Sequence, residues 1–426
     1  MLDIKIIRNT PEIVRNDLEK RKDTTKLHLL EETKKADEEW LSLKKDVDDL
    51  RNKRNEVSKN ISEGKKTGKD VTDLLKIAGS IPQEILAKEA RLIVLEEKIK
   101  KNLLSLPNIL HESVPYGESD KENVTVELVG KKQSFSFPLK SHADLIIEMD
   151  LADIERAAKI SGARFWFLKN EAALLELALE RYAIDFMMKK GFTFLQPPYL
   201  IRREPYEGVT SLGDFEEMLY KIDGEDLYLI ATSEHPLTSM FMNETIEETQ
   251  FPIKMVGLSA CFRKEAGAHG KDTKGIFRGH QFHKVEQIII CKPEDSWKYH
   301  EELIENAKEF FTSLGLHYRQ VNICTGDIGI VAAKKYDLEV WMPVQQEFRE
   351  VVSCSNCTDY QSRRLNMKYR TSEGNKLVHT LNSTVVATSR ALVAIFENFQ
   401  TKEGTIKIPD VLVPYMNGLR EIKKRV

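Results

Sequence analysis

The sequence of 426 residues is poor in cysteine and contains no long apolar run. Its 5 cysteines are an odd number spread over a long chain, which predicts reduced thiols rather than a disulfide framework. No uninterrupted apolar run approaches the ~20 residues that a membrane span requires. The opening MLDIKIIRNTPE also lacks the apolar core of a secretory signal. We therefore expect a cytoplasmic protein that makes no membrane contact.

The chain also lacks a strong net charge, since its formal charge at pH 7 is only −3. A nucleic-acid partner would therefore have to bind a local basic patch rather than the whole surface. Hydrophobic residues make up 41% of the chain and charged residues 31%, which is typical of globular proteins. The length suits two or three domains with at least one large core.

The first quarter of the chain has helical periodicity. Thr10 as N-cap and Pro11 in the first turn predict a short helix that ends near Arg21. Apolar residues then follow heptad spacing in two series. The first series is Ala36, Trp40, Leu43, Val47, Leu50, Arg54, Val57 and Ile61, and the second is Ala78, Ile81, Ile85, Leu92, Leu95, Ile99 and Leu106. A Gly- and Lys-rich turn at Ser62–Lys69 joins them, so we expect an antiparallel helical hairpin.

One segment interrupts the second series. Gly79 and Pro82 disfavour a helix interior, and Ser80 with Gln83 matches a capping box. We therefore expect the second helix to break and restart at this point.

Beyond Pro107 and Pro115 the patterns change to mixed helices and strands, which predicts a helical arm over residues 1–108 and a second domain over 109–426. The expected helices are Glu171–Lys190, Glu294–Leu314 and Thr384–Phe399, and the expected strands are Leu227–Ile230, Ile253–Arg263, Phe277–Cys291 and Leu377–Asn382. Long strands with few helices between them favour an α+β fold with a mostly antiparallel sheet.

The stretch Phe262–Ile290 carries the most chemical information. Alternation places Arg278, His280, Phe282, Lys284 and Glu286 on one face of the second expected strand. In the first expected strand, Cys261, Arg263 and Glu265 share a face. Such a face suits a nucleotide cleft, because arginine binds phosphate, an aromatic ring stacks on a base and a carboxylate binds an ammonium group. A solvated sheet face with cross-strand ion pairs would give the same pattern. Alternation alone leaves both interpretations open.

FRKE followed by FRGHQFHKVE resembles motif 2 of class II aminoacyl-tRNA synthetases, in the form found in seryl-tRNA synthetases. GFTFLQPPYL with Pro198 resembles motif 1, ATSEHP a serine-binding loop, REVVSCSNCTDYQSRR a metal- and ATP-contacting strand, and HTLNSTVVATSRALVAIFEN motif 3. The helical arm and LPNILHESVP at its base also match. Ser389 and the TSEHP form resemble the archaeal or eukaryotic branch of the family.

This resemblance implies a class II catalytic domain that activates L-serine with ATP and Mg²⁺ and transfers it to tRNA(Ser), and also to tRNA(Sec) where one exists. Arg263 would clamp the α-phosphate, Arg278 the terminal phosphates, and Phe282 with Arg390 would sandwich adenine, so Arg263 and Arg390 are the expected catalytic residues. The full expected ATP-binding set is Arg263, Lys264, Glu265, Arg278, Gly279, Phe282, Glu350, Val351, Val352, Ser353 and Arg390. Glu350 and Ser353 would hold Mg²⁺. The expected serine pocket is Thr232, Ser233, Glu234, Arg263, Glu286, Asn382 and Thr384.

The arm offers cations for tRNA phosphates, although a charge run is also compatible with a merely solvated turn. They are Arg51, Lys53, Arg54, Lys59, Lys65, Lys66 and Lys69. Cys354 and Cys357 have the spacing of half a zinc site, but no second pair follows, so we expect no structural zinc. Cys261 and Cys324 are expected in the core, and Trp40 in the heptad packing.

The helix before motif 1 predicts a homodimer, because it carries an apolar face formed by Leu174, Leu175, Ala178, Leu179 and Ile184. Two other functions remain to be distinguished. A paralogue that loads a carrier protein would lack the arm, and a non-catalytic descendant would lose the motif arginines.

Overall fold

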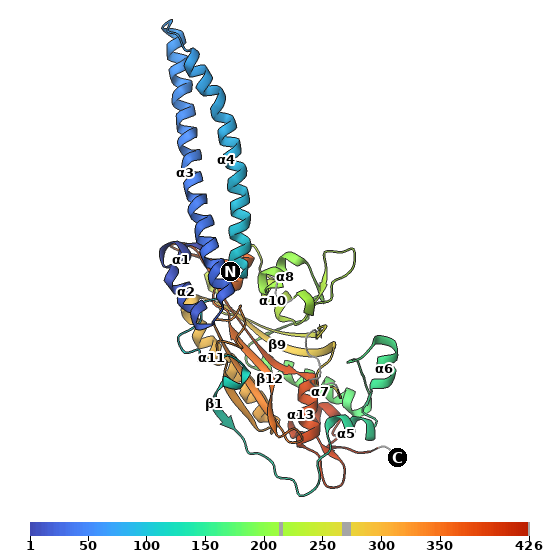
Figure 1. Ribbon diagram of the computed structural model, residues 1–426. Helices are drawn as coiled ribbons and strands as arrows, with labels where there is room; N and C mark the ends of the chain where they lie inside the picture. Colours follow the sequence, from blue (N-terminus) through green and yellow to red (C-terminus); the bar gives the residue numbers. More distant parts are fainter. Residues whose placement is uncertain (213–215, 266–273, 425–426) are drawn as a thin grey trace. The chain divides into compact units, whose positions relative to one another are not determined.

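The computed structural model describes residues 1–212, 216–265 and 274–424, which divide into two compact units. The first unit is Met1–Ile109 and the second is Leu110–Val426. We describe each unit by itself (Figure 1). Among the described residues, none of the helices combines the length and the apolar character that crossing a membrane requires.

The first unit consists of two short helices and a long helical hairpin. Its helices are α1 (Ile4–Asn9), α2 (Pro11–Lys20), α3 (Thr24–Lys66) and α4 (Thr72–Ser105). The 43 residues of α3 correspond to about 65 Å of helix at 1.5 Å per residue. As predicted, α2 has Thr10 as its N-cap and a proline in its first turn. The expected turn at Ser62–Lys69 is too long, because α3 continues to Lys66 and only then turns.

The hairpin closes through a close approach at Gly64. A Cβ atom at this position would lie 2.5 Å from Cγ1 of Val71, so any larger residue would push the two helices apart. Lys65 and Lys66 lie in the last turn of α3, where a cation interacts favourably with the helix dipole. The helix dipole is therefore a local structural reason for the positive charge at the turn.

The arm core follows the heptad series but is thin. Val47, Ile81 and Ile85 form one small buried cluster, with Leu50 and Leu92 packed against it. A larger cluster at the base joins both long helices to α1 and α2. Its buried members are Leu2, Ile7, Val14, Leu18, Leu30, Ala36, Leu95, Ile99, Leu103 and Leu106.

The predicted break in the second helix is wrong, because α4 runs without interruption through Pro82. The side chain of Pro82 is exposed, so its ring meets solvent, while its neighbours Ile81 and Ile85 are 1% and 7% exposed. The hydroxyl of Ser80 donates to the carbonyl of Ile77 instead of capping a new helix. Burial of the two isoleucines outweighs the lost backbone hydrogen bond.

The second unit is built on an eight-stranded, mostly antiparallel sheet, as the sequence predicts. Its order is β1-β10-β11-β12-β15-β9-β8-β4, and only β4 pairs in parallel. In that order the strands are Val124–Val129, Tyr318–Asn322, Lys334–Met342, Glu347–Asn356, His379–Ala387, Gln281–Cys291, Ile253–Phe262 and Thr193–Leu195.

Helices cover this sheet. They are α5 (His142–Glu148), α6 (Ile154–Ser161), α7 (Asn170–Lys189), α8 (Arg203–Val209), α10 (Glu234–Ser239), α11 (Ser296–Ser313), α12 (Tyr360–Leu365) and α13 (Thr388–Asn398). The main core contains residues of α7, α11 and α13 together with those of the central strands. A second core surrounds α8 and the strand β6 (Tyr228–Leu229), where Tyr206 and Tyr228 are fully buried.

The shorter strands form three two-stranded sheets and one three-stranded sheet. They are β2 (Ala152–Asp153), β3 (Phe167–Leu168), β5 (Leu200–Ile201), β6 (Tyr228–Leu229), β7 (Thr245–Ile246), β13 (Lys368–Thr371), β14 (Gly374–Leu377), β16 (Ile406–Lys407) and β17 (Glu421–Ile422).

Two predicted boundaries are corrected by this topology. The segment from Thr384 continues as strand β15 to Ala387, and helix α13 begins only at Thr388. Strand β9 begins at Gln281 rather than Phe277, so Arg278 and His280 precede it. Residues 266–273, which belong to the loop that joins the two expected strands, lie outside the described residues.

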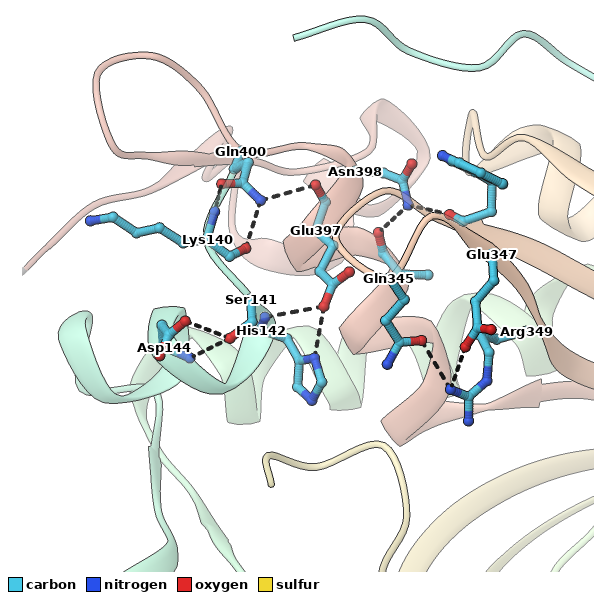
Figure 2. Close-up of polar contacts among 12 residues, drawn as sticks. Lys140, Ser141, His142, Asp144, Gln345, Glu347, Arg349, Glu397, Asn398 and Gln400 are labelled. Atoms are coloured by element: carbon cyan, nitrogen blue, oxygen red, sulfur yellow. Dashed lines mark hydrogen bonds and ion pairs between the residues drawn. The ribbon is translucent and has the colours of Figure 1, made fainter. Parts of the chain in front are cut away.

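Buried polar contacts fix the C-terminal end of α13 (Figure 2). The backbone N–H and the ring Nδ1 of His142 lie 3.2 and 2.8 Å from Oε1 of Glu397, which is 1% exposed. The amide of Asn398 donates to the carbonyl of Trp341 at 3.0 Å. Because these groups are buried, their pairing holds the helix in one position on the sheet.

Candidate active site

A cleft of about 390 Å³ lies over the central strands of the second unit. Residues from the strands β9, β12 and β15 and from the helices α10 and α13 line it. The predicted site residues among them are Thr232, Glu234, Arg263, Phe282, Glu286, Glu350, Val351, Ser353, Asn382, Thr384 and Arg390. Residues far apart in the sequence thus converge on one concave surface.

One end of the cleft is organised around the carboxylate of Glu286, which is 2% exposed. The hydroxyls of Thr232 and Thr384 both donate to its Oε1 at 3.2 Å, and Lys284 forms an ion pair with it. Strand pairing brings these groups together, because Thr384 is directly opposite Glu286 in the register of β15 and β9. A buried carboxylate with three donors is held rigidly and can recognise a small polar ligand.

Glu234 is the second carboxylate at this end. The amides of Asn382 and Gln361 donate to its Oε1 at 3.0 and 3.3 Å. Burial, and after it the nearby charge of Glu286, raises the pKa of Glu234 to about 7. Two carboxylates in one pocket therefore favour the binding of a cation such as an ammonium group.

Gly257 allows the loop before α10 to lie directly on the sheet. A Cβ atom at this position would lie 2.4 Å from Cδ1 of Leu237 and 3.3 Å from Cβ of Ser233. Gly257 is also the register partner of Glu286. The missing side chain thus lets Thr232 and Glu234 reach the pocket.

The other end of the cleft carries arginines and an aromatic ring. The Nε–H of Arg263 donates to the carbonyl of Ala231 at 3.3 Å, and its guanidinium carbon lies 5.3 Å from the ring centroid of Phe282. Arg390 donates to the carbonyl of Glu350 at 2.9 Å and pairs with its carboxylate at 3.2 Å. Phe282 and Arg390 line the same cleft without stacking on each other, because Arg390 lies against Phe277 instead.

Glu350 lies deep in the cleft, but 45% of its side chain remains open to the solvent within it. Burial alone would favour the neutral acid, but Arg390, Lys335 and Arg263 outweigh it and lower the pKa of this carboxyl. Glu350 is therefore ionised at neutral pH and accessible to a ligand in the cleft.

A second cavity of about 530 Å³ shares Glu350 and Arg390 with the cleft. It is strongly polar, and its lining includes Arg278, Asp337 and Glu339. Arg278 donates to Oε2 of Glu265 at 2.7 Å, so these two predicted ATP-binding residues pair with each other. The cleft and this cavity together offer room for a nucleotide and its phosphates.

Six of the predicted site residues do not line the cleft. Arg278 lines the adjoining cavity, Glu265 pairs with it, and the other four lie elsewhere. Ser233 is fully buried and donates to the carbonyl of Gly257, while Val352 is fully buried in the main core. The backbone N–H of Lys264 donates to the carbonyl of Met218. A Cβ atom at Gly279 would lie 2.1 Å from the ring of Trp166.

Cys261 was expected on the face of Arg263, but it is fully buried and lies outside the cleft lining. Strand β8 ends at Phe262, so the alternation does not extend to Arg263 and Glu265. Glu265 has a positive φ of 49°, which turns the chain away from the strand direction.

Several residues of the site have no role predicted from the sequence. Lys284 lies on the predicted face and pairs with Glu286, and Gln361 binds Glu234. Lys335 lines the cleft, and Asp337 lines the adjoining cavity. Strand alternation in KKYDLEV could have placed Lys335 and Asp337 on one face. It could not have shown that Asp337 lies opposite Ser353, because the register between β11 and β12 has no signal in the sequence.

Cys354 and Cys357 are both buried. The Sγ of Cys354 lies 3.8 Å from the carbonyl of His300, and the amide of Asn382 lies 3.7 Å from Sγ of Cys357. The nearby His379 shares a hydrogen bond with the hydroxyl of Ser296. Burial raises the pKa of both thiols. Cys261 and Cys324 are buried as predicted.

Two family models match the chain. The model of the seryl-tRNA synthetase N-terminal domain matches residues 1–110, and that of the class II core domain of tRNA synthetases (G, H, P, S and T) matches residues 218–399. The serine–tRNA ligase of Methanocella arvoryzae is 53% identical to this chain, and the alignment covers 98% of this chain and 99% of that protein. The chain belongs to the seryl-tRNA synthetase family.

Solved structures of seryl-tRNA synthetases agree with this assignment. The enzyme from Pyrococcus horikoshii, complexed with ATP, is 48% identical and superposes over the whole of both chains with a TM-score of 0.97. The cytoplasmic serine–tRNA ligase of Naegleria fowleri, in complex with AMP, is 36% identical with a TM-score of 0.92 over 100% of this chain and 99% of that one. The family activity is ligation of serine to tRNA at the cost of ATP, and this chain has that activity.

Proposed function

We propose that the cleft of the second unit forms seryl-adenylate and that the helical arm selects the tRNA. In the first step, a carboxylate oxygen of serine attacks the α-phosphorus of ATP, a new O–P bond forms, and pyrophosphate leaves. In the second step, a ribose hydroxyl at the tRNA end attacks the acyl carbon, and AMP leaves. The observation that carries the proposal is the convergence of Arg263, Phe282, Glu286, Glu350 and Arg390 in one cleft.

Arg263, at the end of the cleft that carries the arginines, is the residue that stabilises the transferring phosphate. Its guanidinium is permanently charged, and the hydrogen bond to the carbonyl of Ala231 orients it. Negative charge that builds up on the α-phosphate during attack is offset by a fixed, preorganised cation. Phe282 and Arg390 bind the adenine, and Arg278 binds the terminal phosphates from the adjoining cavity.

The pocket around Glu286 and Glu234 binds serine. The ammonium group of serine is attracted by two carboxylates, and the serine hydroxyl finds polar partners among Thr232, Asn382 and Thr384. A site built to bond a hydroxyl rejects an analogue without one, because its own buried polar groups would be left unpaired. Threonine carries an additional methyl group, for which the cavity must leave no room.

Mg²⁺ fits the oxygen donors beside the phosphate end. Glu350 is ionised, Ser353 supplies a hydroxyl, and Oδ1 of Asp337 is a buried oxygen without a hydrogen-bond partner among the described residues. Burial raises the pKa of Asp337 to about 7, and a bound cation would reverse that effect. Mg²⁺, when bound, would supply positive charge that neutralises the phosphates of ATP. This chain's own contribution is to hold the donors, through the pairing of β11 with β12.

The arm binds tRNA(Ser) through its phosphates, and the same surface would serve tRNA(Sec) if the organism has one. Seven cations of α3 and the turn are exposed: Arg51, Lys53, Arg54, Lys59, Lys65, Lys66 and Lys69. Among the residues that the structure describes, Arg51 is the only one of these seven cations with ion-pair partners, which are Glu89 and Asp48. Unpaired cations on a rigid hairpin suit a polyanion, and binding should depend steeply on salt.

We further propose a homodimer, although the apolar face predicted from the sequence is mostly wrong. Leu175, Ala178, Leu179 and Ile184 pack inside this chain. The exposed apolar residues of α7 are instead Leu174, Leu177 and Met188, at 46%, 59% and 53%. Covering this stripe is a reason to dimerise. A monomer by light scattering at micromolar concentration would contradict the proposal, and we expect the dimer to act in the cytoplasm.

Amino-acid-dependent exchange of pyrophosphate into ATP tests the chemical proposal. We expect serine to support exchange and the other amino acids, including threonine, cysteine and alanine, to support far less. Charging of tRNA(Ser) with labelled serine should follow on the same preparation. Exchange with an amino acid other than serine, or equally with several, would contradict the assignment of the pocket.

A further inference from the structure

A cluster of polar groups lies behind the ATP end of the cleft and joins three elements. Glu176 and Glu180 project from one face of α7, His283 from β9, and Thr388 from the first turn of α13. The potential ligand or proton-binding atoms of Glu176, Glu180 and His283 all lie within 4.8 Å of one another. None of these four residues has a role in the proposed function.

The hydroxyl of Thr388 has two oxygen neighbours but only one proton. Its Oγ1 lies 2.6 Å from Oε1 of Glu176 and 3.1 Å from the carbonyl oxygen of His283. Thr388 is fully buried, so water does not supply a further donor. A carbonyl oxygen can only accept, and an ionised carboxylate can only accept. Both contacts are complete hydrogen bonds only if Glu176 carries a proton and donates it to Thr388, which then donates to His283.

The charges around Glu176 support the same assignment. Nδ1 of His283 lies 2.6 Å from Oε1 of Glu180, and this contact raises the pKa of His283. The cavity of about 290 Å³ that opens onto Glu176 and His283 has no lysine or arginine among the described residues of its lining. One imidazolium therefore balances one carboxylate, and a second ionised carboxylate would remain unbalanced.

We infer that Glu176 is held as the neutral carboxylic acid and positions both sides of the ATP clamp through the chain Glu176–Thr388–His283. Phe282 precedes His283 on β9, and alternation directs its ring to the cleft. Arg390 follows Thr388 by two residues on α13. This inference rests on the proposed roles of Phe282 and Arg390 in binding ATP. Glu176 is a positioning residue, since it does not line that cleft.

The arrangement anchors α13 at both ends. His142 and Glu397 fix the C-terminal end (Figure 2), and Glu176 with Thr388 fixes the N-terminal end that carries Arg390. Burial raises the pKa of Glu176, the hydrogen bond with Thr388 and the charge of His283 oppose this, and the charge of Glu180 adds to it. As pH rises through that pKa, ionised Glu176 takes the hydroxyl proton of Thr388 for its own hydrogen bond. The carbonyl of His283 then loses its donor.

The test is the pH dependence of KM for ATP in serine-dependent pyrophosphate exchange, measured from about pH 6 to 9. The wild type should lose ATP affinity on the alkaline side by roughly 3- to 10-fold, the worth of one hydrogen bond, with little change in kcat. Glu176→Gln keeps a neutral donor and should bind ATP well without this alkaline loss. Glu176→Ala should bind ATP weakly at every pH, and Lys189→Gln, on the exposed face of the same helix, should match the wild type.

Three outcomes would overturn the inference. One is a wild-type profile that coincides with that of Glu176→Gln over the whole range. Another is a Glu176→Gln variant that is as defective as Glu176→Ala. The third is tight binding of Zn²⁺ to the wild type but not to Glu176→Gln in Mg²⁺-free buffer, which would mean that Glu176 is an ionised metal ligand. Failure of the proposed function is separate, because it would appear as normal exchange by Arg263→Ala at every pH.

Discussion

The two compact units differ in where they hold their charged groups. The long helices of the arm pair charges at the surface, as in Arg51 with Glu89 at 2.8 Å and Arg91 with Glu39 at 2.7 Å. The catalytic unit buries carboxylates in its cleft and in the adjoining cavity, where the pKa values of Glu234 and Asp337 rise to about 7. The two buried carboxylates of the arm, Asp17 and Asp37, are paired with arginines. Exposed ion pairs contribute little to stability, and a surface of this kind keeps its other cations accessible to a polyanion. Buried carboxylates lower the stability of the fold but suit the specific recognition of a ligand.

The core follows the same division. The middle of the arm has a cluster of only three buried residues, while the catalytic unit packs many residues between its sheet and helices. A thin core and a surface with exposed cations suit an element that binds by charge and shape. A thick core suits an element that must hold side chains at fixed distances. The comparison therefore predicts that chemistry and tRNA selection can be damaged separately.

The largest effect is expected in the catalytic unit. Arg263→Ala should lower serine-dependent pyrophosphate exchange by about 10³-fold, because a preorganised charge is lost from the transition state. Circular dichroism should show an intact fold. Arg51→Ala in the arm is the matched control and should leave exchange unchanged. Near-normal exchange by the Arg263 variant would contradict its role.

The second effect belongs to the arm alone. Pro82 removes one backbone hydrogen bond inside α4, so Pro82→Ala should stabilise the arm by up to about 3 kcal/mol. Hydrogen exchange of the arm amides should slow, while pyrophosphate exchange stays the same. Gln83→Ala, at the exposed neighbouring position, should change little. Faster amide exchange in the Pro82 variant would show that the proline is needed for the native arm.

A pH effect should distinguish the buried carboxylates of the pocket from the surface charges of the arm. The pKa of Glu234 is raised to about 7, so its ionised fraction falls from about one half at pH 7 to about one eleventh at pH 6. KM for serine should therefore rise as pH falls from 7 to 6, and KM for ATP should not. Glu234→Gln should bind serine weakly without this dependence. An unchanged pH profile in that variant would assign the titration to another group.

The smallest effect concerns one hydrogen bond in the serine pocket. Thr384→Ala removes a donor to Glu286 and should raise KM for serine by roughly 3- to 10-fold with little change for ATP. Thr384→Ser keeps the hydroxyl and is the matched control. Equal losses for serine and ATP would contradict the placement of Thr384 in the serine pocket.

The periodic parts of the fold could be predicted from the sequence. Heptad spacing gave the long hairpin, and alternation in FHKVE placed Phe282, Lys284 and Glu286 on one side of β9. Local rules were wrong where packing decided the outcome. The burial of Ile81 and Ile85 carries α4 through Pro82, and the apolar face of α7 is mostly covered by its own chain.

The long-range contacts of the site had no local signal. The ion pair of Arg278 with Glu265 depends on the path of the chain after β8. The position of Asp337 beside Ser353 depends on the register of β11 and β12, which are joined by a turn. The neutral state inferred for Glu176 depends on a hydroxyl of α13 far away in the sequence. Such features require the assembled sheet.

Truncation of the arm tests the division of labour most directly. Deleting residues 47–87 and joining the ends with a short Gly-Ser loop removes all seven proposed tRNA-binding cations. It keeps the base cluster and the contact of Trp40 with Glu96. On the same folded preparation, serine-dependent pyrophosphate exchange should stay within about twofold of the wild type. Charging of tRNA(Ser) should fall by about 10³-fold through lost phosphate contacts. Charging at near wild-type efficiency, or loss of exchange as well, would contradict the account.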